Sequence, residues 1–235
     1  MSPQGFAIII GAGPTSGAGI ARVLASPDHG NLAVALLARN PDNLSSLCSD
    51  LRKTSQGVFQ PFPTDTGADN LRRTFKQIAE HDNFKDLKLK LAVYHVKHSS
   101  KKPFLEETAE AFTDSMQTYT TGAFVFAQEA LKLFYAQNGG QTLLSETNGE
   151  KKGTIIFTGT LGAMRANVGF AAYGATRARR GWCRRPWPRS TASLACSACM
   201  LLRTAASSMQ IMRTLARPSS LWVHELGLRP AQEAF

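Results

Sequence analysis

The chain has 235 residues, enough for one domain with a complete hydrophobic core, and no run of about 18 apolar residues that would predict a membrane span. Its 27 Lys and Arg against 17 Asp and Glu give a net charge of +10, but ten of the arginines and only two of the acids lie in residues 177–235. A basic arm that binds DNA normally mixes Lys with Arg, and this segment has no Lys and holds all three tryptophans. The charge therefore predicts no nucleic-acid partner.

The first residues lead directly into the apolar stretch GFAIII, with no basic region and no cleavage site for a secretory signal. Four cysteines without a disulfide framework agree with a reducing compartment. We therefore expect a cytoplasmic protein.

Strands and helices alternate along the first 176 residues. Short apolar runs indicate buried parallel strands at Ala7–Ile10, Leu32–Ala38, Val58–Pro63, Leu87–Val96 and Thr154–Thr158. Helical spacing is found at Gly17–Ala25, Leu44–Thr54, Leu71–His81, twice within Glu106–Ala136, and from Phe170 onward. The order predicts an α/β fold, a Rossmann-type doubly wound parallel sheet with right-handed crossovers. Ligands of such sheets bind at the carboxyl ends of the strands.

A glycine-rich turn, GAGPTSGAGIA, follows the first predicted strand. Gly13, Gly17 and Gly19 are spaced so that the backbone can approach a pyrophosphate, and the following helix offers free N–H donors and a positive dipole end. Ser16 can add a hydroxyl donor to a phosphate. The alternative is a tight turn that binds no ligand.

The residues after the second and third strands indicate which dinucleotide is bound. An acid after the second strand would bind the 2′-hydroxyl of NAD, whereas Arg39 offers a guanidinium to a 2′-phosphate, which favours NADP over a merely solvated arginine. Asp65 follows the third strand, where it can accept a hydrogen bond from the adenine amino group or cap the next helix.

These residues, together with YGATR, resemble the short-chain dehydrogenase/reductase family over residues 5 to about 177. The stretches that carry the resemblance are GAGPTSGAG, LLAR, GAFVFAQEAL and YGATR. It implies one NAD(P)-binding domain over residues 1–235, regular to 177, and an oxidoreductase that acts on a small-molecule carbonyl or alcohol. The helix at Gly122–Phe134 implies, by the same resemblance, a homodimer or homotetramer.

The resemblance also assigns the catalytic residues. Tyr173 would exchange a proton with the substrate oxygen, and Arg177 stands where the family has a lysine that lowers the pKa of the tyrosine. The two are spaced i,i+4, on one helix face, and a cation favours the phenolate. Arg177 keeps that charge but cannot release a proton. Thr160, 13 residues before Tyr173, offers a hydroxyl in place of the family's serine.

Other positions depart from the family pattern. Tyr119 stands where the family has an asparagine of a water relay, and YHVK replaces NNAG after the fourth strand. His95 and His98 in HVKH have no third ligand spaced with them, so no metal site is predicted. Tyr173 itself has the alternative of a core tyrosine.

The chain changes character at about Arg177. Pro186 and Pro188 would end the helix that the family continues after the tyrosine. With codons read one base earlier, Trp182-Cys183 becomes valine and Trp187-Pro188 becomes alanine. The free positions then permit the expected amphipathic helix and an apolar strand ending in a glycine pair. We interpret residues 178–213 as out of frame, and we expect an incomplete or irregular C-terminal part.

The last residues, LWVHELGLRPAQEAF, resemble in the printed frame a tail, W-x-x-E-L-x-L-R-P, found in one branch of the family, so the frame is regained near Arg217. Three functions remain open. The first is an NADP-dependent reductase or alcohol dehydrogenase whose activity is weak with the printed sequence. The second is a non-catalytic NADP-binding relative, and the third is the non-functional product of a mis-spliced or decayed gene.

Overall fold

The computed structural model describes residues 2–98, 102–139, 153–159, 171–178, 196–202 and 225–226. The side chains of Tyr173, Arg177 and Ala178, and those of the last two segments, lie outside the described part. Among these residues, a parallel sheet of seven strands has the order β3-β2-β1-β4-β5-β6-β7. The prediction of a Rossmann-type doubly wound sheet is confirmed.

The strands are β1 (Phe6–Ile10), β2 (Ala33–Ala38), β3 (Phe59–Pro63), β4 (Leu89–Tyr94), β5 (Gly153–Gly159), β6 (Cys196–Leu202) and β7 (Glu225–Leu226). The chain runs outward from β1 to β3 and then crosses to β4 on the other side of β1. The two halves therefore meet between β1 and β4, where Ile10 pairs with both Leu37 and Tyr94. Pro61 and Pro63 are tolerated because β3 is an edge strand.

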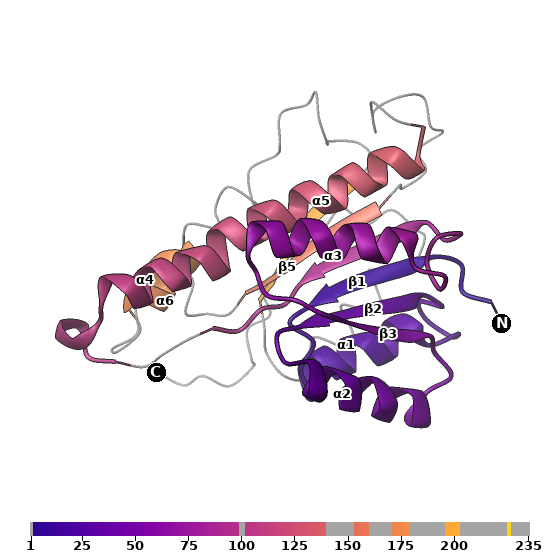
Figure 1. Ribbon diagram of the computed structural model, residues 1–235, viewed down its shortest axis with the longest axis horizontal. Helices are drawn as coiled ribbons and strands as arrows, with labels where there is room; N and C mark the ends of the chain where they lie inside the picture. The colour runs from indigo at the N-terminus through magenta and orange to yellow at the C-terminus, as the bar shows by residue number, and fades with distance from the viewer. Residues whose placement is uncertain are drawn as a thin grey trace.

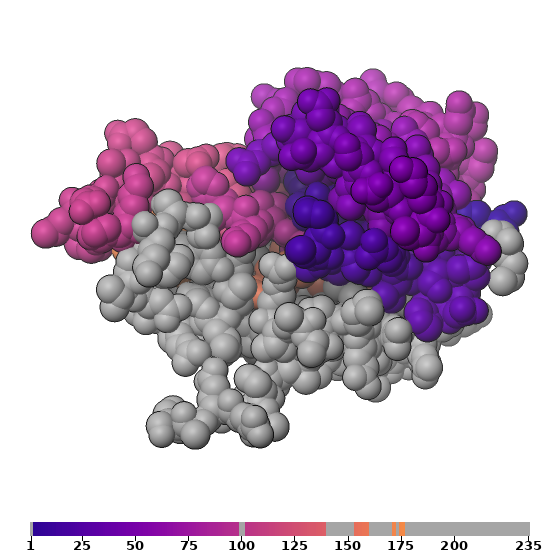
Figure 2. Space-filling model, turned by 90° about the horizontal axis from the view of Figure 1, so that it is seen from below, coloured from indigo at the N-terminus to yellow at the C-terminus, as the bar shows by residue number. Residues whose placement is uncertain are grey.

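The helices are α1 (Ser16–Ala25), α2 (Pro41–Thr54), α3 (Ala68–Glu80), α4 (Ala109–Met116), α5 (Gly122–Gln137) and α6 (Ala171–Ala178). A 3-10 turn η1 (Phe104–Glu106) precedes α4, and a π-helical segment η2 (Gln117–Thr121) joins α4 to α5. Helices α1 and α2 cover one face of the sheet and α3 and α5 the other (Figure 1). The segment containing η1 and α4 extends beyond the N-terminal elements at one end of the molecule (Figure 2).

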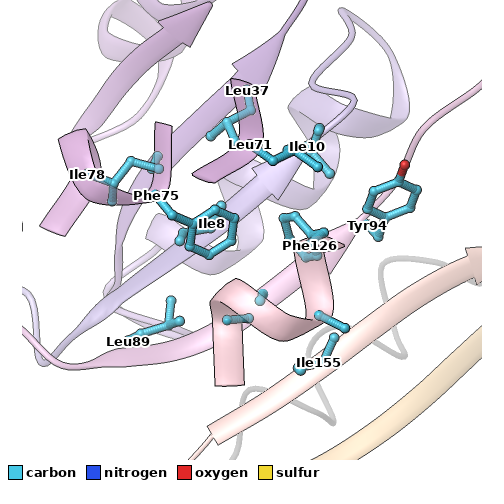
Figure 3. Close-up of a cluster of buried hydrophobic side chains, with 14 of the residues drawn as sticks. Ile8, Ile10, Leu37, Leu71, Phe75, Ile78, Leu89, Tyr94, Phe126 and Ile155 are labelled. Carbon is cyan, nitrogen blue, oxygen red and sulfur yellow. The ribbon is translucent and has the colours of Figure 1, made fainter. Parts of the chain in front are cut away.

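Each face of the sheet has its own hydrophobic core. Alternate residues of β1, such as Ile8 and Ile9, point to opposite faces and belong to different clusters. On the α3–α5 face, the Phe126 ring meets Phe75 and Tyr94 edge-on, with ring centroids 5.4 and 5.3 Å apart (Figure 3). In the other cluster, burial raises the pKa of Cys48 to about 11, so this residue is a core thiol and not a nucleophile.

The segment 178–213 differs in part from the irregular chain that the sequence predicts. Residues 196–202 form β6, which pairs with β5 along its whole length. The stretch CSACMLL is largely apolar, which suits a strand that pairs with β5 on one side and with β7 on the other. Within 178–213, the structure describes only Ala178 and β6. No helix in the described part of the chain has the length and apolarity to cross a membrane.

The packing of Phe126 yields a test of the core. Phe126→Ala removes a fully buried ring with two aromatic neighbours, and we expect it to lower the free energy of unfolding by about 3–5 kcal/mol. Phe104→Ala, at a ring that is 75% exposed, is the matched control and should change it by less than about 0.5 kcal/mol. Urea unfolding measures both variants. Equal losses of unfolding free energy would contradict the placement of Phe126 in the hydrophobic core.

Candidate cofactor and catalytic site

The turn after β1 is held against the ends of its two neighbouring strands. The N–H groups of Gly11 and Ala12 both donate to Leu37 O, at 2.9 and 3.1 Å. Gly11 has a φ of +87°, and a Cβ there would lie 2.3 Å from the carbonyl oxygen of His95. Both facts require glycine. Sequence reasoning missed Gly11, although its place directly after a buried strand was a usable signal.

The three predicted glycines have different surroundings. A Cβ at Gly17 would lie 3.0 Å from the Ala12 Cα, so this glycine lets α1 pack closely on the turn. Cβ atoms at Gly13 and Gly19 would meet no atom of the described residues within 4 Å. The first turn of α1 has no acid, and within the described part the N–H groups of Gly13, Thr15 and Gly17 have no protein acceptor. Open space beside unpaired donors at a helix N-terminus fits a pyrophosphate.

The next two strand ends carry Arg39 and Asp65. Arg39 is exposed and forms no ion pair or hydrogen bond with any other described residue, while its neighbour Asn40 caps α2 by accepting from Asn43 N at 2.9 Å. Asp65 Oδ1 accepts from Gly67 N at 2.8 Å and from Asn70 Nδ2 at 2.9 Å. The N-cap of α3 is Gly67, so Asp65 shapes the turn before the helix and is not its cap. Its contact with adenine stays a prediction.

A chain of hydrogen bonds crosses the switch point between β1, β4 and β5. Ser16 Oγ lies 2.9 Å from His95 Nε2, and His95 Nδ1 lies 2.9 Å from Thr158 Oγ1. The Thr158 hydroxyl in turn donates to Tyr94 O at 3.3 Å. His95 and Thr158 are both 6% exposed. The sequence marked His95 as a departure from the family and as one of two histidines without a third metal ligand, and its link to Ser16 follows from the pairing of the strands.

Tyr119 takes a structural role in the position of the family's relay asparagine. Its fully buried hydroxyl donates to His98 O and accepts from His98 N at 2.5 Å. The His98 ring pairs with Asp114 at 2.9 Å, so the segment after β4 is anchored on α4 and η2. Lys97 is exposed. Groups of three or more metal-binding side chains are absent from the described part of the chain.

Helix α6 brings the backbone of Tyr173 and Arg177 beside α4 and η2. Thr120 Oγ1 donates to Thr176 O at 3.5 Å, and the Thr176 hydroxyl donates to Ala172 O at 2.7 Å. The side chains of Tyr173 and Arg177 are not described, and Thr160, one residue after β5, lies outside the described residues. Their catalytic roles therefore stay predictions.

Residues 5–180 match the family of short-chain dehydrogenases. The chain belongs to the short-chain dehydrogenase family. It is accordingly a member of a family of oxidoreductases. No curated protein matches the chain.

Solved structures show the same fold at low sequence identity. A short-chain dehydrogenase from Rhodopseudomonas palustris is 22% identical with a TM-score of 0.72, covering 96% of this chain and 98% of that one. NAD+-bound xylitol dehydrogenase is 17% identical with a TM-score of 0.67, covering 86% and 70%. L-sorbose reductase from Gluconobacter frateurii, complexed with NADPH and L-sorbose, is 15% identical with a TM-score of 0.67, covering 86% and 69%. Because the cofactors of these structures differ, the fold alone does not choose between them.

The contrast between Gly11 and Gly19 yields a test of the turn. Gly11→Ala places a methyl group against His95 O in a strained conformation, and we expect a loss of at least about 1–3 kcal/mol of unfolding free energy. Gly19→Ala adds a methyl group in open space on a helix, so it should be neutral or stabilise by up to about 1 kcal/mol. Denaturant unfolding measures both. Equal effects would show that the close approach of β1 and β4 does not constrain Gly11.

Proposed function

We propose that the protein is an NADP-dependent oxidoreductase that interconverts a ketone and a secondary alcohol. The observation that carries the cofactor assignment is Arg39, an exposed guanidinium at the end of β2 without an acidic partner among the described residues. A 2′-phosphate would supply that partner as a charge-assisted, two-point contact. The residue directly after β2 is Arg39, so this position has no carboxylate that could bind the 2′-hydroxyl of NAD.

The remaining strand ends would hold the other parts of the cofactor. The N–H groups of Gly13, Thr15 and Gly17, with the N-terminus of α1, would bind the pyrophosphate, and Asp65 would accept from the adenine amino group. When bound, the nicotinamide supplies or accepts a hydride. Tyr173 would give the proton to the substrate oxygen in reduction and take it in oxidation, with Thr160 orienting that oxygen. Arg177 would favour the phenolate of Tyr173 by its charge.

Two further expectations belong to this proposal. We expect the protein in the cytoplasm, with a small molecule as its only substrate partner. Association into a homodimer or homotetramer through residues 122–134 stays a prediction, supported by Phe124, which is 47% exposed on α5.

Cofactor preference is tested by titrating NADPH and NADH into the protein. We expect wild type to bind NADPH about 10- to 100-fold more tightly, since the contact with Arg39 is worth about 1.5–3 kcal/mol. Arg39→Ala should remove that preference, because it weakens the binding of NADPH and leaves the affinity for NADH unchanged. Arg22→Ala, an exposed arginine in the last turn of α1, is the control and should change neither affinity. Equal affinities of wild type for the two cofactors would end the NADP assignment.

Catalysis is tested with three forms of the chain: as printed, with Arg177→Lys, and with residues 178–213 rebuilt in the other frame with any missing exon restored. General acid–base catalysis contributes about 10²–10⁴-fold and positioning up to about 7–11 kcal/mol, so the rebuilt chain should gain most. Ketone-dependent oxidation of NADPH measures each form. Ordinary turnover after Arg177→Lys alone would show that the tail is irrelevant to the site. NADPH binding without turnover in any form would indicate a non-catalytic relative. The lack of a cooperative melting transition would indicate a non-functional product.

A further inference from the structure

The hydrogen bonds of His95 define which of its nitrogens carries a hydrogen. Tyr94 O is a carbonyl and can only accept, so the Thr158 hydroxyl donates to it. Thr158 Oγ1 then accepts from His95 Nδ1, which is protonated in either charge state of the ring. In the neutral imidazole, Nε2 is therefore the acceptor, and the Ser16 hydroxyl donates to it over 2.9 Å.

This arrangement opposes the binding of an anion by Ser16. A hydroxyl has one hydrogen, and while that hydrogen is directed at His95 Nε2, Ser16 offers a phosphate only lone pairs. Protonation of His95 reverses the bond, because Nε2–H then donates to Ser16 Oγ. The Ser16 hydrogen is released toward the phosphate, and a positive charge is added behind it.

We propose that His95 is a positioning residue that couples a proton to cofactor binding, so that His95 becomes protonated when the pyrophosphate of a dinucleotide contacts Ser16 at the start of α1. The inference rests on the proposed dinucleotide binding and adds a linked proton to it. Reciprocity requires that bound dinucleotide favours the protonated imidazole. Affinity is then highest at low pH and falls as the pH rises through the range in which His95 loses its proton, by at most about tenfold per pH unit for one proton.

Among the residues that the structure describes, few other titratable groups lie on the elements that pack around His95. The segment 6–21, which forms β1, the glycine turn and the start of α1, contains none, and neither does β5. On β4 they are Lys90 and Tyr94, whose hydroxyl donates to Thr118 O at 2.5 Å. Beyond β4 lie exposed Lys97 and the pair of His98 with Asp114, and Arg22 stands in the last turn of α1. His98 is thus the second histidine on this segment, and a His98 variant is the control for proton uptake that does not come from His95.

The experiment is calorimetric titration of the full chain with NADPH near pH 7.5, in two buffers of different ionisation enthalpy, which counts the protons taken up. NADH is titrated in parallel, because it lacks the 2′-phosphate, which itself titrates near pH 6. We expect uptake of a fraction of a proton, up to about one, with both cofactors. His95→Asn keeps a polar side chain but cannot titrate in this range, and it should abolish the uptake that NADH shows.

Two variants separate the proposed coupling from simpler explanations. Ser16→Ala keeps a titratable His95 but removes its link to the phosphate, so this variant should also lose the proton uptake. It tests the inference independently of whether His95→Asn folds. His98→Gln should bind both cofactors with unchanged uptake. Uptake that persists in Ser16→Ala or disappears in His98→Gln would overturn the inference, as would binding by wild type without any uptake. Absence of binding of either dinucleotide would instead overturn the proposed function, and the inference with it.

Discussion

The close approach of β1 and β4 is the constraint on which the rest of the structure depends. Gly11 turns the chain away from β1 at a φ of +87°, directly beneath the carbonyl of His95, where no side chain has room. The bonds from Gly11 and Ala12 to Leu37 then fix the turn against β2 as well. Because the turn is fixed on both sides, α1 begins at a defined point over the sheet. The same approach brings Ser16 within reach of His95.

The sequence predicted the architecture well because hydrophobic patterns report burial. Every predicted strand through residue 158 is present, shifted by at most two residues at either end. Helices begin earlier than predicted: α2 starts at Pro41 rather than Leu44, and α3 at Ala68 rather than Leu71. The first turn of α2 is polar and is held by the cap that Asn40 makes with Asn43 N, so no apolar pattern marks its start. In the first turn of α3, before Leu71, only Ala68 packs on the core, and Asn70 bonds to Asp65 in the preceding turn.

The candidate site was predictable where it depends on position along the chain and not where it depends on contacts between strands. Gly13, Gly17, Arg39 and Asp65 follow strand ends in sequence, and the structure places all of them at one edge of the sheet. The hydrogen bonds from Ser16 through His95 to Thr158 join residues 79 and 63 positions apart, and no local pattern encodes that distance. Likewise, the role of Tyr119 is determined by the backbone of His98 and not by its neighbours in sequence.

The π-helical segment η2 has a geometric effect on everything that follows it. An α-helix turns by about 100° per residue, so a wide turn that accommodates one extra residue rotates the next helix by that amount without bending the rod. Helix α4 can therefore lie against α6 while α5, in the same rod, presents Phe126 and Phe134 to the sheet. The irregular turn sets the angle between the surface that holds the helix of Tyr173 and the surface that holds the core. A single helical phase shift thus separates the face of α4 that packs on α6 from the face of α5 that packs on the sheet.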